Sequence, residues 1–120
     1  MNSPVDVTTK QRGAITVAHI AGEPDLANVR EVERQLWDGI PNTSTGAVVD
    51  LSGVRYLDSA GLNLLFNLQR GLGKRGQRLC LIVPERALIR AILHVVQLDA
   101  AIEILSTIEE ALRSFGVPAV

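Results

Sequence analysis

The chain has 120 residues and a mass of 12.9 kDa, which fits a single domain able to bury its own core. Apolar residues make up 47% and charged residues 21% of the chain, a balance that excludes wholesale disorder. Lys plus Arg total 12 against 13 for Asp plus Glu, and only 3% of residues are aromatic, so the sequence predicts no direct nucleic-acid partner.

The single cysteine and the lack of long apolar runs further restrict the class of protein. Cys80 is the only cysteine, so neither an internal disulfide nor a thiolate metal cluster can form. It lies in the apolar run 79–83 and is interpreted as a small core residue of a strand. The N-terminus lacks the basic start and apolar centre of a signal peptide, and no run of about 18 apolar residues occurs. We therefore expect a cytoplasmic protein without membrane insertion.

The first elements in chain order are predicted to be two paired strands. Residues 5–9 alternate between apolar and polar, which is typical of an edge strand, and residues 10–13 form a polar turn. Residues 14–21 are β-branched and alternating, so a second strand is expected to pair antiparallel with the first. Which of its faces points inward stays open. His19 lies on this strand, where a surface or hydrogen-bonded role is expected.

A loop and a helix come next. Residues 22–25 form the loop, and Asn28 with Glu31 three residues later predicts a capping box. The inner stripe of the helix is expected to contain Val29, Val32, Gln35 and Leu36. Gly39 and Pro41 end the helix, and residues 42–46 read as an exposed loop.

The segment 47–65 carries the most information. Residues 47–51 form a nearly continuous apolar run, typical of a strand buried on both faces, and Ser52 and Gly53 end it. Asp58 or Ser59 then supplies the N-cap of a helix. Helical spacing is followed by Leu62, Leu65, Phe66, Gln69 and Leu72. Another, polar face contains Ser59, Asn63, Asn67 and Arg70.

The rest of the chain repeats the alternation of strand and helix. The glycines around Lys74 and Arg75 end the helix and do not match a phosphate-binding loop. Residues 78–83 are predicted to form a buried strand, and Pro84 is expected at the first position of the next helix. The broad inner face of that helix is expected to contain Leu88, Ile89, Ile92, Leu93, Val95 and Val96. Its polar stripe contains Arg86, Arg90 and His94.

The chain is expected to end with a turn, a strand and a helix. Leu98 and Asp99 are predicted to form the turn, followed by a short strand over 102–105. Ser106 or Thr107 caps a last helix through Ser114, and residues 117–120 form a tail. The complete order implies an α/β fold in one domain over residues 1–120. It has a mixed, mostly parallel central sheet with an N-terminal antiparallel hairpin and about four helices.

Ser59 is the strongest candidate functional residue. It heads the polar face of its helix, where a phosphate would meet unpaired backbone N–H groups and the positive end of the helix dipole. Phosphorylation would add about 1.5 to 2 negative charges beside Asp58 and could repel an acidic partner surface. A purely structural capping role is the alternative.

The string from Tyr56 to Leu62, YLDSAGL, resembles the phosphorylation motif of bacterial anti-sigma factor antagonists, the stand-alone STAS domains. A second match, IAGEPD at residues 20–25, resembles the turn before the first helix of that family. The likeness extends over about residues 5–112 and implies a STAS fold. Departures from the family pattern are Pro24 for an aliphatic residue, Asn28 for threonine, and Ala60 for a second serine.

The resemblance implies a partner-switching function. Unmodified, the protein would bind an anti-sigma factor that is a serine kinase and so free a sigma factor; phosphorylated on Ser59, it would let go. A phosphatase would remove the phosphate. The residues implied to border the partner are Asp25, Asp58, Ser59, Gly61, Asn63 and Asn67. No catalytic residue, metal or cofactor is implied for this chain.

Three other functions stay open at this stage. An enzyme could use Ser59 as nucleophile with His19 or His94 as base, although no GxSxG or SxxK motif is present. A receiver-type domain could accept phosphate on Asp50, but the expected acidic pair and late lysine are missing. A STAS subunit of a lipid-transport or stress-sensing complex would keep the fold and change the partner.

Overall fold

The computed structural model describes residues 5–118 and contains one five-stranded sheet in the order β1-β2-β3-β4-β5. The strands are β1 (Asp6–Arg12), β2 (Ile15–Ala21), β3 (Gly46–Gly53), β4 (Arg78–Ile82) and β5 (Glu103–Leu105). The helices are α1 (Val29–Gly39), α2 (Ser59–Lys74), α3 (Leu88–Val95), α4 (Leu98–Ala101) and α5 (Ile108–Ser114). β1 and β2 are antiparallel and all other neighbours are parallel, which confirms the predicted α/β fold class.

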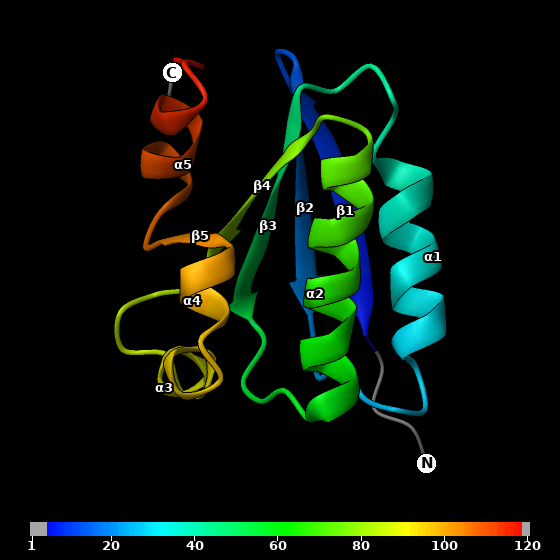
Figure 1. Cartoon of the computed structure of the whole chain (residues 1–120), viewed down its shortest axis with the longest axis vertical. Coiled ribbons are helices and arrows are strands. Elements are labelled where there is room, and N and C mark those ends of the chain that lie inside the picture. Colours follow the sequence, from blue (N-terminus) through cyan, green and yellow to red (C-terminus); the bar gives the residue numbers. More distant parts are fainter. Residues whose placement is uncertain (1–4, 119–120) are drawn as a thin grey trace.

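Helices cover both faces of the sheet, so the second strand buries side chains on both of its faces. Ala18 and Ile20 join the larger core cluster with α1 and α2, which lie side by side over one face (Figure 1). Ile15 and Val17 join a smaller cluster closed by α5. The alternation of residues 14–21 left open which face of this strand points inward. In the structure, both of its faces are buried.

Cys80 lies in the smaller cluster and is fully buried, which confirms its interpretation as a core residue. Burial raises the pKa of the Cys80 thiol to about 12. The thiol is therefore protonated at neutral pH and a poor nucleophile.

The N-terminal hairpin is longer than predicted. β1 continues to Arg12, which pairs with Ile15 of β2, so the expected turn over residues 10–13 is confined to Gly13 and Ala14. Gly13 has φ 63°, the left-handed conformation that glycine adopts most readily. The end of β1 can be polar because β1 is an edge strand, which pairs with a neighbouring strand on one side only.

The predicted capping box of α1 is wrong. Asn28 is the N-cap residue but makes no side-chain cap hydrogen bond. Its side chain turns back to the preceding loop instead, where Oδ1 accepts from Asp25 N at 2.9 Å and Nδ2 donates to Glu23 O at 3.1 Å. Glu31 pairs with Arg34, and this hydrogen bond lowers the pKa of the Glu31 carboxyl. Asn28 thus stabilises the loop rather than the helix.

The segment after β4 differs most from expectation. Pro84 does not start a helix; it begins a turn closed by Ala87 N donating to Pro84 O at 3.0 Å, and α3 follows. Of the six residues predicted for the inner face, Ile89 and Leu93 are buried and Ile92 is half-buried, so this face is narrower than predicted. Two apolar residues of this helix, Leu88 and Val95, are 77% and 79% exposed.

The C-terminal part contains one helix more than predicted. Leu98 and Asp99, expected as a turn, begin α4, and Gln97 precedes them in a left-handed conformation with φ 61°. α5 is capped by Thr107, whose hydroxyl accepts a hydrogen bond from Glu110 N at 3.2 Å. Thr107 was one of the two predicted N-cap residues. Of the predicted tail, residues 119–120 lie outside the described residues. Within residues 5–118, no helix has the length and apolar character needed to cross a bilayer.

Candidate functional site

The connection from β3 to α2 presents Ser59 at the start of a helix. Asp58 is the N-cap: its backbone is extended, and its Oδ1 accepts a hydrogen bond from Gly61 N at 2.9 Å. Ser59 is consequently the first helical residue rather than the cap, which decides between the two predicted alternatives. Its side chain is exposed and makes no hydrogen bond within the described part of the chain. The hydroxyl is therefore accessible to another protein.

Removing the cap should destabilise this end of the fold. Asp58→Ala is expected to lower the free energy of unfolding by about 1 kcal/mol, since the N–H of Gly61 loses its partner. Urea denaturation followed by circular dichroism measures this change. Asp58→Asn is the matched control, because an amide oxygen also caps a helix. Equal losses for both variants would contradict the capping role.

The outer face of α2 has the predicted polar composition. Ser59, Asn63, Asn67 and Arg70 are all exposed, and the Arg70 guanidinium donates to the side-chain oxygen of Asn67. The Asn63 side chain has no hydrogen-bond partner among residues 5–118. The candidate contact residues Asn63 and Asn67 therefore continue the surface of Ser59 along the helix.

The inner face of α2 is displaced from the predicted stripe. Leu65 and Leu72 are buried as expected, but the stripe also includes Leu64 and Leu68, which the prediction left out. Phe66 is only half-buried. The buried arc is wide because α2 packs on the sheet and on α1 at the same time (Figure 1).

The loop between β2 and α1 meets the first turn of α2. A Cβ atom placed on Gly61 would lie 2.9 Å from the carbonyl oxygen of Pro24 and 2.8 Å from Leu57 Cδ2. Gly22 N also donates to Gly53 O at 3.1 Å, which ties the same loop to the end of β3. The two segments that carry the sequence motifs therefore pack against each other, and Gly61 permits the close approach.

Asp25 organises this loop from within. Its carboxylate accepts from the backbone N–H groups of Ala27 at 2.9 Å and Asn28 at 3.1 Å. The side chain is half-buried, and its hydrogen bonds stay within its own loop. Asp25 would therefore affect a partner by fixing the conformation of this loop. Asp25 is thus held at the same edge of the sheet as Ser59.

Three exposed apolar side chains lie in the segments that follow the strands at this edge. Leu26 is 82% exposed in the segment after β2, and Tyr56 is 58% exposed in the segment after β3. Leu88, at the start of α3, follows β4 and lines a shallow hollow together with residues 52, 54, 55 and 87. Because the carboxyl ends of parallel strands share one edge, these residues come from neighbouring segments at the lower edge in Figure 1.

Sequence reasoning missed these apolar residues as site candidates. Leu88 satisfied a helical apolar pattern and was expected in the core, although periodicity does not distinguish a core from a docking surface. Leu26 and Tyr56 lie outside any periodic stripe; Leu26 directly follows the motif residue Asp25, and Tyr56 is the first residue of the motif YLDSAGL. That position was the available signal, since large apolar residues in loops beside a polar motif are typical of contact surfaces.

The two imidazoles are paired with carboxylates. His19 Nδ1 lies 2.9 Å from Asp50 Oδ2, and His94 Nδ1 lies 2.8 Å from Asp99 Oδ2. No hydrogen bond joins Ser59 to either ring among residues 5–118, so the described structure contains no Ser–His nucleophile pair.

Asp50 is poorly placed to accept a phosphate. It is only 8% exposed, and its carboxylate accepts from Ser52 N at 2.9 Å in addition to bonding His19. The receiver-type alternative would need this carboxylate open to solvent. Within the described ranges, no group of three or more His, Cys, Asp or Glu residues is arranged to hold a metal ion.

Comparison with known proteins gives consistent results. Residues 6–111 match the family described as the STAS domain. The anti-sigma-F factor antagonist RsfB of Mycobacterium tuberculosis is 29% identical over 117 residues, covering 93% of this chain and 92% of that protein. The crystal structure of an anti-sigma factor antagonist from Mycobacterium paratuberculosis superposes with a TM-score of 0.78 at 25% identity, covering 92% of this chain and 93% of that one.

A third relative shares the fold at lower identity. The Bacillus anti-sigma factor antagonist SpoIIAA in its phosphorylated form has a TM-score of 0.61 and 19% identity, covering 93% of this chain and 99% of that one. At this identity the likeness concerns the fold alone.

Proposed function

Because this chain belongs to the STAS domain family, we propose that it is an anti-sigma factor antagonist controlled by phosphorylation of Ser59. In its unmodified form it binds an anti-sigma factor that is also a serine kinase, and thereby frees a sigma factor. Phosphorylation of Ser59 by that kinase ends the binding, and a phosphatase restores it. The names of the mycobacterial relatives support this proposal.

The observation that carries the proposal is the exposed Ser59 hydroxyl at the first position of α2. Leu62 N bonds to Asp58 O, and Gly61 N bonds to the Asp58 carboxylate. The N–H groups of Ser59 and Ala60 have no partner among residues 5–118, so a phosphate on Ser59 has donors available. The helix end therefore tolerates the modification while its charge changes the surface.

The surroundings of Ser59 explain how the charge acts on binding. Exposed Leu26, Tyr56 and Leu88 provide apolar area at the same edge, which a partner would cover. A dianionic phosphate in that surface stays hydrated and is costly to desolvate against apolar groups. Phosphorylation thus opposes docking without requiring a change of fold.

The predicted site residues have separate roles in this proposal. Asp58 and Gly61 hold the first turn of α2, and Asp25 shapes the adjoining loop. Asn63 and Asn67 offer exposed amides for direct contact with the anti-sigma factor. The chain itself supplies no catalytic group, since the kinase brings ATP.

Phosphate mapping tests the proposal directly. The protein is incubated with its candidate anti-sigma factor and ATP, and modified peptides are identified by mass spectrometry. A single phosphate on Ser59 is expected. Phosphate at another position would overturn the site assignment. Affinity purification that recovers a transporter ATPase or a stress-sensing assembly in place of a kinase would overturn the proposed partner.

The exposed apolar residues lead to a prediction about affinity. Leu88→Ser is expected to weaken binding to the anti-sigma factor about fivefold to tenfold, because the variant removes apolar area at the proposed interface. Isothermal titration calorimetry measures this affinity. Val95→Ser is the matched control: Val95 lies on the same helix, is about equally exposed, and does not line the hollow beside the β3–α2 connection. Similar effects of both substitutions would contradict the proposed location.

A further inference from the structure

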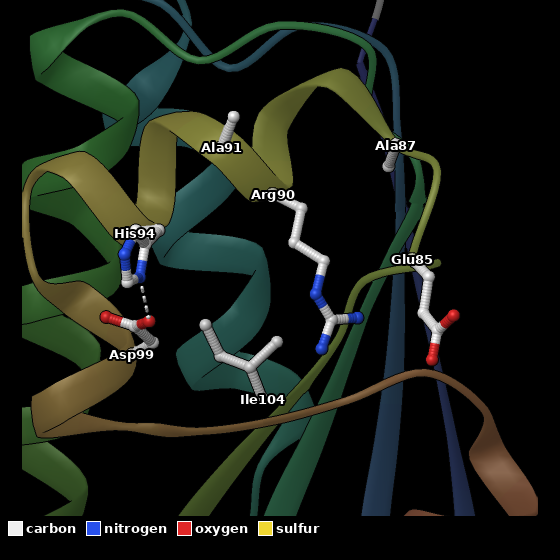
Figure 2. Close-up of a pocket in the computed structure, with 7 residues that line it drawn as sticks. All are labelled: Glu85, Ala87, Arg90, Ala91, His94, Asp99 and Ile104. Atoms are coloured by element: carbon white, nitrogen blue, oxygen red, sulfur yellow. Dashed lines mark hydrogen bonds and ion pairs between the residues drawn. The ribbon is translucent and has the colours of Figure 1, made fainter.

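We propose that the cavity between α3, α4 and β5 binds a short aliphatic monocarboxylate, with its carboxylate on Arg90. This site is separate from Ser59 and does not depend on the function proposed above. Its lining residues are Glu85, Ala87, Arg90, Ala91, His94, Asp99 and Ile104 (Figure 2). The volume of about 560 Å³ lies within the usual range of small-molecule sites.

Arg90 is held in place by the protein rather than by an acidic partner. Its Nη1 donates to the carbonyl oxygen of Val83 at 2.6 Å and to Ser106 Oγ at 3.2 Å, and the side chain is half-buried. No ion pair of Arg90 is found among residues 5–118. Nε and Nη2 have no hydrogen-bond partner in the same range, so two donors of a pre-oriented guanidinium remain for an incoming carboxylate.

The other residues that line the cavity indicate the chemistry of the rest of the ligand. Ala87, Ala91 and Ile104 contribute apolar atoms to the lining, which suits an aliphatic chain. Figure 2 shows the Arg90 side chain between the His94–Asp99 pair on one side and Glu85 on the other.

The acidic groups of the lining select against multiply charged anions. Asp99 is hydrogen-bonded to His94, which lowers the pKa of the Asp99 carboxyl and keeps it ionised at neutral pH. Glu85 has no ion pair within the described residues and adds a second negative charge at the opposite side. Beside these two carboxylates every negative charge on a ligand is penalised, and Arg90 is the one guanidinium of the lining that offsets it, so a monocarboxylate fits better than a phosphate.

The test uses hexanoate as the probe and the full-length chain. Two-dimensional ¹H–¹⁵N spectra are recorded during titration, including the Arg90 Nε–Hε resonance, which observes the proposed contact without any substitution. We expect saturable shifts of this resonance and of the amides of Ala91 and Ile104 in the millimolar range of hexanoate. Hexanol, with the same chain and no charge, should leave the Arg90 Nε–Hε resonance unchanged, and inorganic phosphate should bind at least ~10-fold more weakly.

A conservative substitution of Arg90 provides a second test of the proposal. Arg90→Lys keeps the charge but loses the planar fork, and is expected to weaken hexanoate binding about 10-fold. Arg86→Lys, at an exposed arginine outside the lining, is expected to bind as the unmodified protein does. The proposal is overturned by an absence of saturable shifts up to about 50 mM hexanoate. It is also overturned by equal shifts of the Arg90 resonance with hexanol, or by unchanged affinity of Arg90→Lys.

Discussion

Ser59→Asp is expected to weaken binding to the anti-sigma factor by at least about 10-fold, and Ser59→Ala is expected to bind normally while accepting no phosphate. An aspartate at the first position of α2 places a permanent charge in the proposed docking surface. The same charge is favourable to the helix, because it faces the positive end of the dipole. A loss of affinity therefore cannot be attributed to unfolding of α2.

Three measurements separate the effects of the Ser59 variants. Calorimetric titration gives the affinity for the anti-sigma factor, mass spectrometry gives the phosphate content after incubation with ATP, and urea denaturation gives the free energy of unfolding. Thr43→Asp is the control for charge alone, since Thr43 is exposed in the loop before β3, at the opposite edge of the sheet. If Ser59→Asp and Thr43→Asp bind equally well, phosphorylation of Ser59 does not regulate docking.

The parts of this site that the sequence predicted depend on local signals. Asp58 and Ser59 follow a buried apolar run and precede a helical pattern, so the position of the helix start could be predicted within one residue. The order of strands and helices followed from the same alternation. Such signals act over a few residues and require no knowledge of which segments meet in space.

The errors occurred where a pattern has more than one physical solution. Asn28 can bond forward to a helix or back to a loop, and only the position of Glu23 O and Asp25 N selects the second. Leu88 and Val95 repeat with helical spacing, but α3 is short and only one side of it meets the core. Sequence periodicity identifies an apolar face and does not say what covers it.

The contact between Gly61 and Pro24 belongs to the same class of unpredicted features. It joins two segments far apart in the chain, and its only sign in the sequence is a glycine in the first turn of a helix. Glycine in a helix costs about 0.5 to 1 kcal/mol relative to alanine, so a structural reason for its presence is expected. The close approach of the β2–α1 loop supplies that reason.

Gly61→Ala is therefore expected to destabilise the protein by about 1 to 3 kcal/mol, despite the better helix propensity of alanine. The new Cβ would lie 2.9 Å from Pro24 O, a backbone atom, so the loop or the helix must move. Gly73→Ala in the same helix is the matched control, since apart from its chain neighbours and the nearby backbone of its own helix no atom lies within 4 Å of the position that its Cβ would take. A gain in stability of up to about 1 kcal/mol is expected for that variant.

Urea denaturation of both glycine variants measures these changes in the free energy of unfolding. Phosphorylation kinetics extend the test to the site, because displacement of the β2–α1 loop alters the surface beside Ser59, and Gly61→Ala should be modified more slowly than Gly73→Ala. Equal free energies of unfolding of the two variants would mean that the β2–α1 loop can move away from the new Cβ without loss of stability. In that case the two motif segments are neighbours in space but do not depend on each other, and Asp25 loses its proposed role in shaping the surface around Ser59.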